Sequence, residues 1–293
     1  MSRLAEGIRA GRFVVTSELT PPKGVDIQDL LARAEALRNH VDAFNLTESP
    51  RARMAVEPKS VGRMLLERGI EPIVQITARD RNRIAIQADM LGAALLGIEN
   101  LLVMRGDPPN KGDHPEAKPV YDLDAVEMLR AARYLNQGQD LSGSELRGTP
   151  RLFVGATVNP GAPDMYAEIA NVRSKIEAGA QFLQTQGIYD ATALERFLTA
   201  ARIDGVPLLA GIIPLKSVKM AAWLNANVPG IRVPEVLLKE MDAAGAQQRE
   251  TEAGIQIAAR LVSALRPMCA GVHIMALGWE AHIPQILTYS RAM

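Results

Sequence analysis

The stretch 13–23, Phe-Val-Val-Thr-Ser-Glu-Leu-Thr-Pro-Pro-Lys, joins an apolar run to a carboxylate and two prolines. The β-rich residues up to Glu18 predict a buried strand. The pair Pro21-Pro22 cannot donate ladder hydrogen bonds, so the strand has to end there. Glu18 is therefore expected at the carboxyl end of a strand, which is where α/β folds carry their chemistry.

Eight apolar runs of strand length alternate with longer amphipathic runs along the chain. The strands are predicted at 13–18, 41–47, 72–77, 100–104, 151–156, 180–186, 207–214 and 271–276. Helices are predicted near 26–39, 58–68, 81–96, 122–136, 166–176, 193–201, 217–225, 234–243 and 247–265. This rhythm predicts a mainly parallel sheet with crossover helices.

Eight strands are the number that closes a parallel barrel, whereas a doubly wound sheet has fewer strands and a glycine-rich phosphate turn. No such turn occurs in this sequence. The fold class is therefore predicted to be α/β, a (β/α)8 TIM barrel, with additional helices before the last strand. The polar loop 137–150 is the best linker candidate, but the strand rhythm resumes after it, so residues 1–293 are expected to form a single domain.

Composition narrows the function classes. Of the 293 residues, 33 are Lys or Arg and 33 are Asp or Glu, which leaves no net field for nucleic acid or an anionic membrane. The single cysteine, Cys269, excludes an intramolecular disulfide and a thiolate-rich metal site. The chain has neither an apolar signal-peptide region nor a membrane-spanning stretch, so a cytoplasmic location is expected.

In a barrel, the residues at the strand ends surround one mouth. The set expected there is Glu18, Thr47, Thr77, Asp107, Thr157 and Gln186, with the loop after Pro214. Neutral hydrogen-bonding groups with two acids suit a flat, nitrogen-rich ring such as a pterin or a flavin. A buried glutamate with a raised pKa can supply a proton to such a ring. These residue types favour an enzyme over a binding module.

The four histidines form no cluster in the sequence. His40, His114, His273 and His282 fall in a helix end, a loop, a strand and a terminal segment. This spread disfavours a zinc site and a Ser-His-Asp triad. All four are expected to be satisfied core or surface residues, and no metal is expected.

Other charged and aromatic residues have an ordinary structural interpretation. The run Arg79-Asp80-Arg81-Asn82-Arg83 is expected to be a helix start with solvated ion pairs, the alternative being a phosphate or carboxylate clamp. Lys175 is expected to face solvent unless a cofactor phosphate lies over it. Tyr121 and Trp279 are interpreted as packing residues.

Several of these segments resemble the 5,10-methylenetetrahydrofolate reductase family. They follow the family's order through nearly the whole chain, namely Ser17–Lys23, Asp80–Arg83, Val103–Pro109, Lys175–Ala180, Thr185-Gln186 and Gly211–Pro214. Each would be a weak signal alone, and together they are specific. The resemblance implies a flavin-dependent (β/α)8 barrel that reduces methylenetetrahydrofolate to 5-methyltetrahydrofolate.

The resemblance also implies roles for individual residues. Glu18 matches the acid that protonates a folate nitrogen and opens the imidazolidine ring. Asp107 matches the aspartate near flavin and pterin, and Gln186 a glutamine that binds the pterin. The residues expected to contact FAD are Thr47, Thr77, Asp107, Tyr121, Thr157, Glu168, Asn171 and Lys175, with Glu168 where bacterial members often have Asp.

The chain departs from the family pattern at three places. Val218 stands where well-known bacterial members carry a Phe, Gly278-Trp279-Glu280 replaces Asn-Arg-Ala, and Thr157 replaces a tyrosine that contacts flavin. Asp80–Arg83 and Thr185–Tyr189 more closely resemble a branch of the family in which the electron donor varies. The donor therefore stays open between NADH, NADPH and a partner redox protein. Two alternatives follow: a flavin-independent reductase, and a folate-binding subunit that needs a redox partner. A homo-oligomer also stays open, whereas a Schiff-base aldolase would need a strand lysine that none of the eight strands offers.

Overall fold

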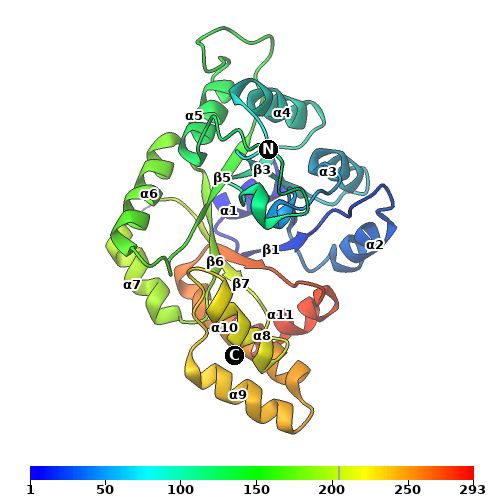
Figure 1. The fold of residues 1–293 in the computed structure, drawn as a ribbon, viewed down its shortest axis with the longest axis vertical. Helices are drawn as coiled ribbons and strands as arrows, with labels where there is room; N and C mark the ends of the chain where they lie inside the picture. The colour runs from blue at the N-terminus through cyan, green and yellow to red at the C-terminus, as the bar shows by residue number, and fades with distance from the viewer. Residues whose placement is uncertain (204) are drawn as a thin grey trace.

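The computed structural model describes residues 1–203 and 205–293, and its eight strands close into a parallel barrel in chain order (Figure 1). The strands are β1 Val14–Leu19, β2 Ala43–Leu46, β3 Pro72–Thr77, β4 Asn100–Met104, β5 Phe153–Val158, β6 Phe182–Gly187, β7 Leu208–Ile212 and β8 Gly271–Ile274. Strand β1 closes the barrel, because Thr16 pairs with Ala43 of β2 on one side and with His273 of β8 on the other. The predicted (β/α)8 barrel is confirmed.

Helices surround the barrel and connect its strands (Figure 1). They are α1 Arg3–Arg9, α2 Gln28–Leu37, α3 Pro58–Leu66, α4 Arg83–Leu95, α5 Ala125–Asn136, α6 Met165–Ala178, α7 Ala191–Ala201, α8 Val218–Asn227, α9 Glu235–Ala246, α10 Glu250–Leu265 and α11 Ile283–Arg291. The predicted additional helices before the last strand are present as α8, α9 and α10. Helices α1 and α11 were not predicted, because each is short and its apolar residues are few.

Local sequence explains where the crossover helices begin. The Asn82 side chain accepts hydrogen bonds from the Ile84 and Ala85 N–H groups at the start of α4. Asp124 and Glu127 form a capping box at the start of α5. Such side chains satisfy backbone donors that a helix start leaves free, and each cap contributes about 1 kcal/mol. The caps hold the loops that precede these helices at the carboxyl ends of the strands.

The amino-terminal end of the barrel is filled by side chains. Here α1 inserts Leu4, which is fully buried among inward-facing strand residues. The Glu71 carboxylate accepts hydrogen bonds from the Arg3 and Leu4 N–H groups, both at 2.9 Å, and so holds the start of α1. The Phe153 and Phe182 rings stack at 5.1 Å. Within the described part of the chain these contacts fill the barrel interior at this end, so we expect a ligand to enter from the opposite end.

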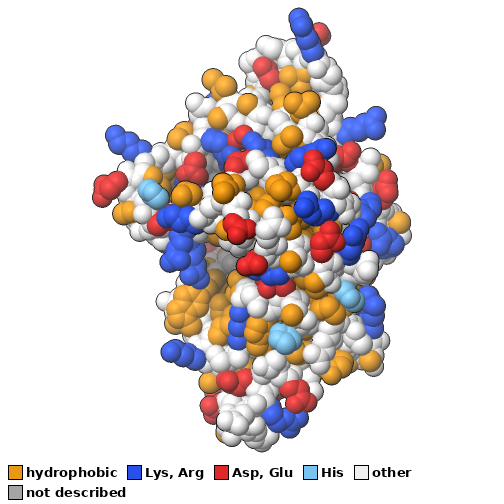
Figure 2. All heavy atoms as spheres, turned by 90° about the vertical axis from the view of Figure 1, so that its right-hand side faces the viewer, with side chains coloured by type: hydrophobic (Ala, Val, Ile, Leu, Met, Phe, Trp, Pro, Cys, Tyr) orange, Lys and Arg blue, Asp and Glu red, His pale blue; other side chains and the backbone are white. Residues whose placement is uncertain are grey.

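Charges are interspersed over the surface. Figure 2 shows Lys, Arg, Asp and Glu side chains mixed across one face of the molecule. Their balance agrees with a formal net charge of zero. Among the described helices, none combines the length and the apolar character that crossing a membrane would require.

Candidate active site

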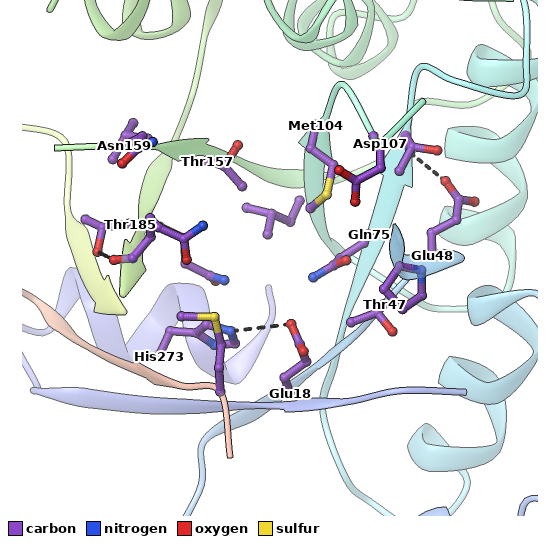
Figure 3. A pocket seen from close by; sticks show the side chains of 18 of the residues that line it. Glu18, Thr47, Glu48, Gln75, Met104, Asp107, Thr157, Asn159, Thr185 and His273 are labelled. Carbon is purple, nitrogen blue, oxygen red and sulfur yellow. Dashed lines mark hydrogen bonds and ion pairs between the residues drawn. The ribbon is translucent and has the colours of Figure 1, made fainter. Parts of the chain in front are cut away.

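A cavity of about 520 Å³ opens at the carboxyl ends of the strands (Figure 3). Its volume lies within the usual range for small-molecule sites. Nine of the ten residues singled out in the sequence line it: Glu18, Thr47, Thr77, Asp107, Thr157, Glu168, Asn171, Lys175 and Gln186. The tenth, Tyr121, lies behind the turn after β4, where its hydroxyl donates to the Gly106 carbonyl at 3.4 Å. The loop after Pro214 contributes no lining residue.

Glu18 lies at the floor of the cavity on β1. Its side chain is 21% exposed. Burial raises the pKa of this carboxyl to about 7, and the charge of Glu280 adds to the effect. Close to neutral pH, a large share of Glu18 is therefore protonated, as a proton donor requires.

His273 faces Glu18 across the floor (Figure 3). Its Nδ1 lies 3.0 Å from the Thr16 hydroxyl, and its Nε2 lies 4.0 Å from a Glu18 carboxylate oxygen. Burial lowers the pKa of His273 to about 3, so the imidazole is neutral and leaves the Glu18 pKa high.

The expectation that His273 is a satisfied histidine was wrong, because Nε2 has no hydrogen-bond partner among the described residues. Its neighbours Val272 and Ile274 pack in the main core between barrel and helices, so strand alternation turns His273 inward. That alternation was the signal in the sequence that could have found it.

Buried amides form a layer that sequence reasoning missed. The Asn45 amide donates to the Gln184 carbonyl oxygen at 3.1 Å, and Gln184 and Gln75 both line the cavity. The hydroxyls of Thr47 and Thr77 are buried without a partner in the described chain. Buried polar atoms are nearly always paired, so these groups indicate a ligand with donors and acceptors of its own.

The arginine run forms a buried clamp rather than a solvated helix start. Glu48 accepts from the Thr77 N–H at 2.5 Å and pairs with Arg81. Arg79 is 3% exposed and donates to the carbonyls of Ser49 and Asp107, both at 3.3 Å. The solvated interpretation was wrong for Arg79 and Arg81, since their guanidinium groups hold three strand-end loops together.

Only the last arginine of the run matches the solvated interpretation. Arg83 is exposed and pairs with Asp122 at 2.9 Å. The alternative interpretation, a clamp for a phosphate or carboxylate ligand, is not supported either. Arg79 pairs with Asp80, and Arg81 pairs with Glu48 and Asp89, so neither guanidinium is free to bind such a ligand.

Lys175 lies inside the site, so its expected exposure to solvent was wrong. The side chain is 6% exposed and its ammonium donates to the Thr157 carbonyl at 2.7 Å. Burial lowers the Lys175 pKa, and the charge of Glu168 opposes this shift. Glu168 also accepts from the Asn159 N–H at 2.8 Å and the Asn171 amide at 3.0 Å. One face of α6 thus supplies a connected polar wall.

Asp107 lies at the rim, exposed, on the turn after β4. Gly106 allows this turn through a φ of +83°, and the Arg105 guanidinium stacks over the Tyr121 ring at 4.7 Å. The described residues contain no cluster of His, Cys, Asp and Glu that could hold a metal ion. The site therefore offers acids, amides and hydroxyls to an organic ligand.

Comparison with known proteins gives a consistent picture. A family model described as methylenetetrahydrofolate reductase matches residues 3–291. Methylenetetrahydrofolate reductase 2 of Schizosaccharomyces pombe is 24% identical over 302 residues, which cover 98% of this chain and 47% of that protein. The 5,10-methylenetetrahydrofolate reductase of Pectobacterium carotovorum is 26% identical, with 79% and 74% covered. This chain thus spans about half the length of the yeast relative.

Solved structures show the same fold. An uncharacterised Clostridium thermocellum protein, described as binding two copies of 5-methyl-5,6,7,8-tetrahydrofolic acid, aligns with a TM-score of 0.65 and 14% identity, over 99% of this chain and 100% of that one. The EDTA monooxygenase of Chelativorans sp. BNC1 aligns with a TM-score of 0.59 and 12% identity, over 96% and 94%. At these identities the likeness concerns the fold alone.

Proposed function

Because this chain belongs to the methylenetetrahydrofolate reductase family, we propose that it reduces 5,10-methylenetetrahydrofolate to 5-methyltetrahydrofolate. We propose FAD as cofactor, NADH or NADPH as electron donor, and residues 1–293 as one domain. The observation that carries the proposal is Glu18, a carboxyl with a pKa raised to about 7 on the floor of the cavity.

The volume of about 520 Å³ and the polar lining of the cavity support flat heteroaromatic ligands. Its unpaired Thr47 and Thr77 hydroxyls and its buried amides match the alternating donors and acceptors of a flavin or a pterin. The described folate complex of the Clostridium thermocellum protein supports a folate ligand on this fold. Residues proposed to hold FAD are Thr47, Thr77, Asp107, Tyr121, Thr157, Glu168, Asn171 and Lys175.

In this proposal, reduced FAD supplies the hydride. Protonated Glu18 gives its proton to a nitrogen of the folate five-membered ring, the carbon–nitrogen bond breaks, and the resulting iminium carbon is ready to accept hydride. The 4.0 Å gap to His273 exceeds a hydrogen bond, so the Glu18 proton stays available to the ligand. Gln186 and Asp107 would hold the pterin ring from the rim.

Glu18→Gln tests this role through the two half-reactions, measured separately by stopped flow. Flavin reduction by the nicotinamide should stay near the wild-type rate. Reoxidation by methylenetetrahydrofolate should slow by roughly 10²-fold or more, the usual contribution of a general acid. Glu240→Gln, on the outer helix α9, is the matched control. Equal loss in both half-reactions would refute the role of Glu18.

A flavin-independent reductase is the second candidate, favoured by Thr157 and Val218 where family members carry aromatic residues at the site. The absorption spectrum separates the two. A yellow protein, or one that becomes yellow with FAD, supports the flavin route, whereas a colourless protein active with a nicotinamide supports direct transfer. An isolated chain that binds folate but is inactive with either nicotinamide would indicate the third alternative, a subunit that needs a redox partner.

A further inference from the structure

The end of strand β6 departs from the alternation of a regular β-strand. Phe182 packs inside the barrel, and Leu183 packs in the core between barrel and helices, as alternation requires. The next three residues, Gln184, Thr185 and Gln186, all line the cavity. In a regular strand Thr185 would point away from the cavity, so the backbone has to be irregular at this position.

The irregularity is a β-bulge in β6 against β7. Gln184 pairs with Leu209, and Gly187 pairs with Gly211, so β6 advances by one residue more than β7 between these two pairings. A bulge of this kind changes the direction of a side chain and occurs frequently beside active sites. Figure 3 shows Thr185 on the wall of the cavity as a result.

The Thr185 hydroxyl holds the bulge together. It accepts a hydrogen bond from the Gly211 N–H at 2.8 Å and donates one to the Gln186 carbonyl at 2.7 Å. Thr185 is 4% exposed, so water has little access to these two bonds. A side chain thus takes the place of a backbone ladder bond between the two strands. Without the hydroxyl, a buried backbone donor would lose its partner, which is costly.

Gly211 allows the bulge to lie directly on β7. A Cβ at this position would lie 2.5 Å from the Thr185 carbonyl oxygen and 2.7 Å from the Gln186 carbonyl oxygen. Beyond the bulge, the Ile188 N–H donates to the Gly211 carbonyl at 2.8 Å. Gly211 therefore contacts the bulge on both sides, through its N–H to Thr185 and through its carbonyl to Ile188.

The bulge also sets the orientation of the Gln186 amide. The Gln186 Oε1 accepts from the Gly187 N–H at 2.9 Å, so the amide oxygen is turned back toward its own strand. Because a backbone N–H can only donate, the amide atom that faces it is the oxygen. This leaves the amide nitrogen, with its two N–H donors, for a ligand in the cavity. Gln186 is thereby suited to the acceptor atoms of a ligand.

We propose that Thr185 is a positioning residue for the folate, because its hydroxyl holds Gln186 in the orientation that presents amide donors to the pterin ring. The inference rests on the proposed function and adds to it the residue that directs Gln186. Thr185 acts through Gln186 and needs no contact with the substrate. Glu18 and the residues proposed to hold FAD lie on other elements, so loss of the hydroxyl should weaken folate binding selectively.

Thr185→Val removes the hydroxyl and keeps the branched shape of the side chain. Calorimetry with 5-methyltetrahydrofolate should show a Kd raised by about tenfold, as expected when one hydrogen bond to the ligand is misdirected. In stopped flow, the methylenetetrahydrofolate concentration that gives half-maximal flavin reoxidation should rise by the same factor. Flavin reduction by the nicotinamide should be unchanged. Thr185→Ser, which retains the hydroxyl, should bind 5-methyltetrahydrofolate as the wild type does.

Thr199→Val is the matched control, because the Thr199 hydroxyl donates to the Glu195 carbonyl at 2.9 Å on the exposed side of α7. Unchanged folate affinity in Thr185→Val would overturn the inference while the proposed function stands. Equal losses in Thr185→Val and Thr185→Ser would also overturn it, since they would assign the effect to packing of the side chain.

Thr185→Cys replaces Thr185→Val if the valine variant does not fold. A thiol is a weak donor and a weak acceptor, so the cysteine variant should raise the Kd of 5-methyltetrahydrofolate and the serine variant should not. Equal affinities in these two variants would overturn the inference. Failure of the wild type to bind 5-methyltetrahydrofolate and to reduce methylenetetrahydrofolate would instead refute the proposed function, and the inference with it.

Discussion

At the scale of one residue, the environment of Glu18 disfavours the charged form of its carboxyl, and this indicates a role beyond stability. Its carboxyl lies largely buried beside a neutral histidine, and the charge of Glu280 raises its pKa further. No cation in the described part of the chain is paired with it. A carboxyl that served only stability would more often pair with a base. The arrangement keeps a proton on Glu18 close to neutral pH at a cost in stability.

Glu18→Gln should therefore stabilise the fold in a pH-dependent way. The folded-state pKa of about 7 lies above the ordinary 4.5, so the native state binds this proton more tightly than the unfolded chain does. The cost of charging Glu18 is absent below pH 4.5, grows as pH rises and is complete above pH 7. Urea unfolding should show a gain of about 2–3 kcal/mol at pH 8 and little gain at pH 5. An equal gain at both pH values would contradict the raised pKa.

The same pKa predicts the pH dependence of the folate half-reaction. A general acid works in its protonated form, so the rate should be nearly constant below pH 6. It should fall about tenfold per unit well above pH 7. The Glu18→Gln variant should show a slow and flat profile over this range. A wild-type rate that rises with pH would contradict proton donation by Glu18.

Sequence reasoning placed Glu18 in the mouth because two prolines end its strand, a local signal. It could not anticipate the role of His273, whose hydrogen bond with Thr16 joins residues 257 positions apart. The sequence alternation on β8 turns His273 inward, but the unsatisfied Nε2 results from the pairing of β8 with β1, which the sequence does not reveal. Burial of Lys175 was missed for the same reason, since the Thr157 carbonyl that accepts a hydrogen bond from its ammonium group lies on another element.

At the scale of elements, ion pairs join the loops around the mouth. Glu48 after β2 links Arg81 before α4 to the Thr77 N–H at the end of β3. The arginine run alone predicted solvated pairs, because its partner Glu48 lies 33 positions away from Arg81. Charge patterns within one segment do not reveal such distant partners.

Glu48→Gln should destabilise the protein measurably. The Glu48 side chain is 9% exposed and that of Arg81 is 20% exposed, so the pair is poorly screened by solvent. Its loss should lower the free energy of unfolding by about 2 kcal/mol, between the values for surface and fully buried pairs. Glu67→Gln, which removes an exposed pair with Arg63 on α3, should change it by less than about 0.5 kcal/mol. Similar changes in the two variants would show that the Glu48–Arg81 pair does not hold the loops together.

At the scale of the whole molecule, eight repeats of strand and helix made the barrel predictable. Strand alternation and helical periodicity repeat in each unit, so local errors of two or three residues at element ends did not change the topology. The helix α1 lies outside this repeat and was missed. It contributes its few apolar residues to the bottom of the barrel, a role that only the closed structure reveals.

Leu4→Ala should therefore cost stability without altering the mouth. Leu4 is fully buried among β-strand side chains, and truncation of such a leucine costs about 2–5 kcal/mol. Val25→Ala, at a side chain that is 94% exposed, is the matched control. Chemical denaturation measures both, and folate affinity should stay unchanged in both. A cost of less than 1 kcal/mol for Leu4→Ala would show that α1 does not seal the barrel.

The seal formed by α1 also bears on the order of events during turnover. Because the cavity opens at the carboxyl ends of the strands, the proposed nicotinamide and folate would both enter from that side, and we expect them to bind one after the other. In the proposed function, we expect the oxidised nicotinamide to leave before the folate binds at the same floor. Initial-rate measurements with both substrates varied should then give parallel double-reciprocal lines, the pattern of a ping-pong mechanism.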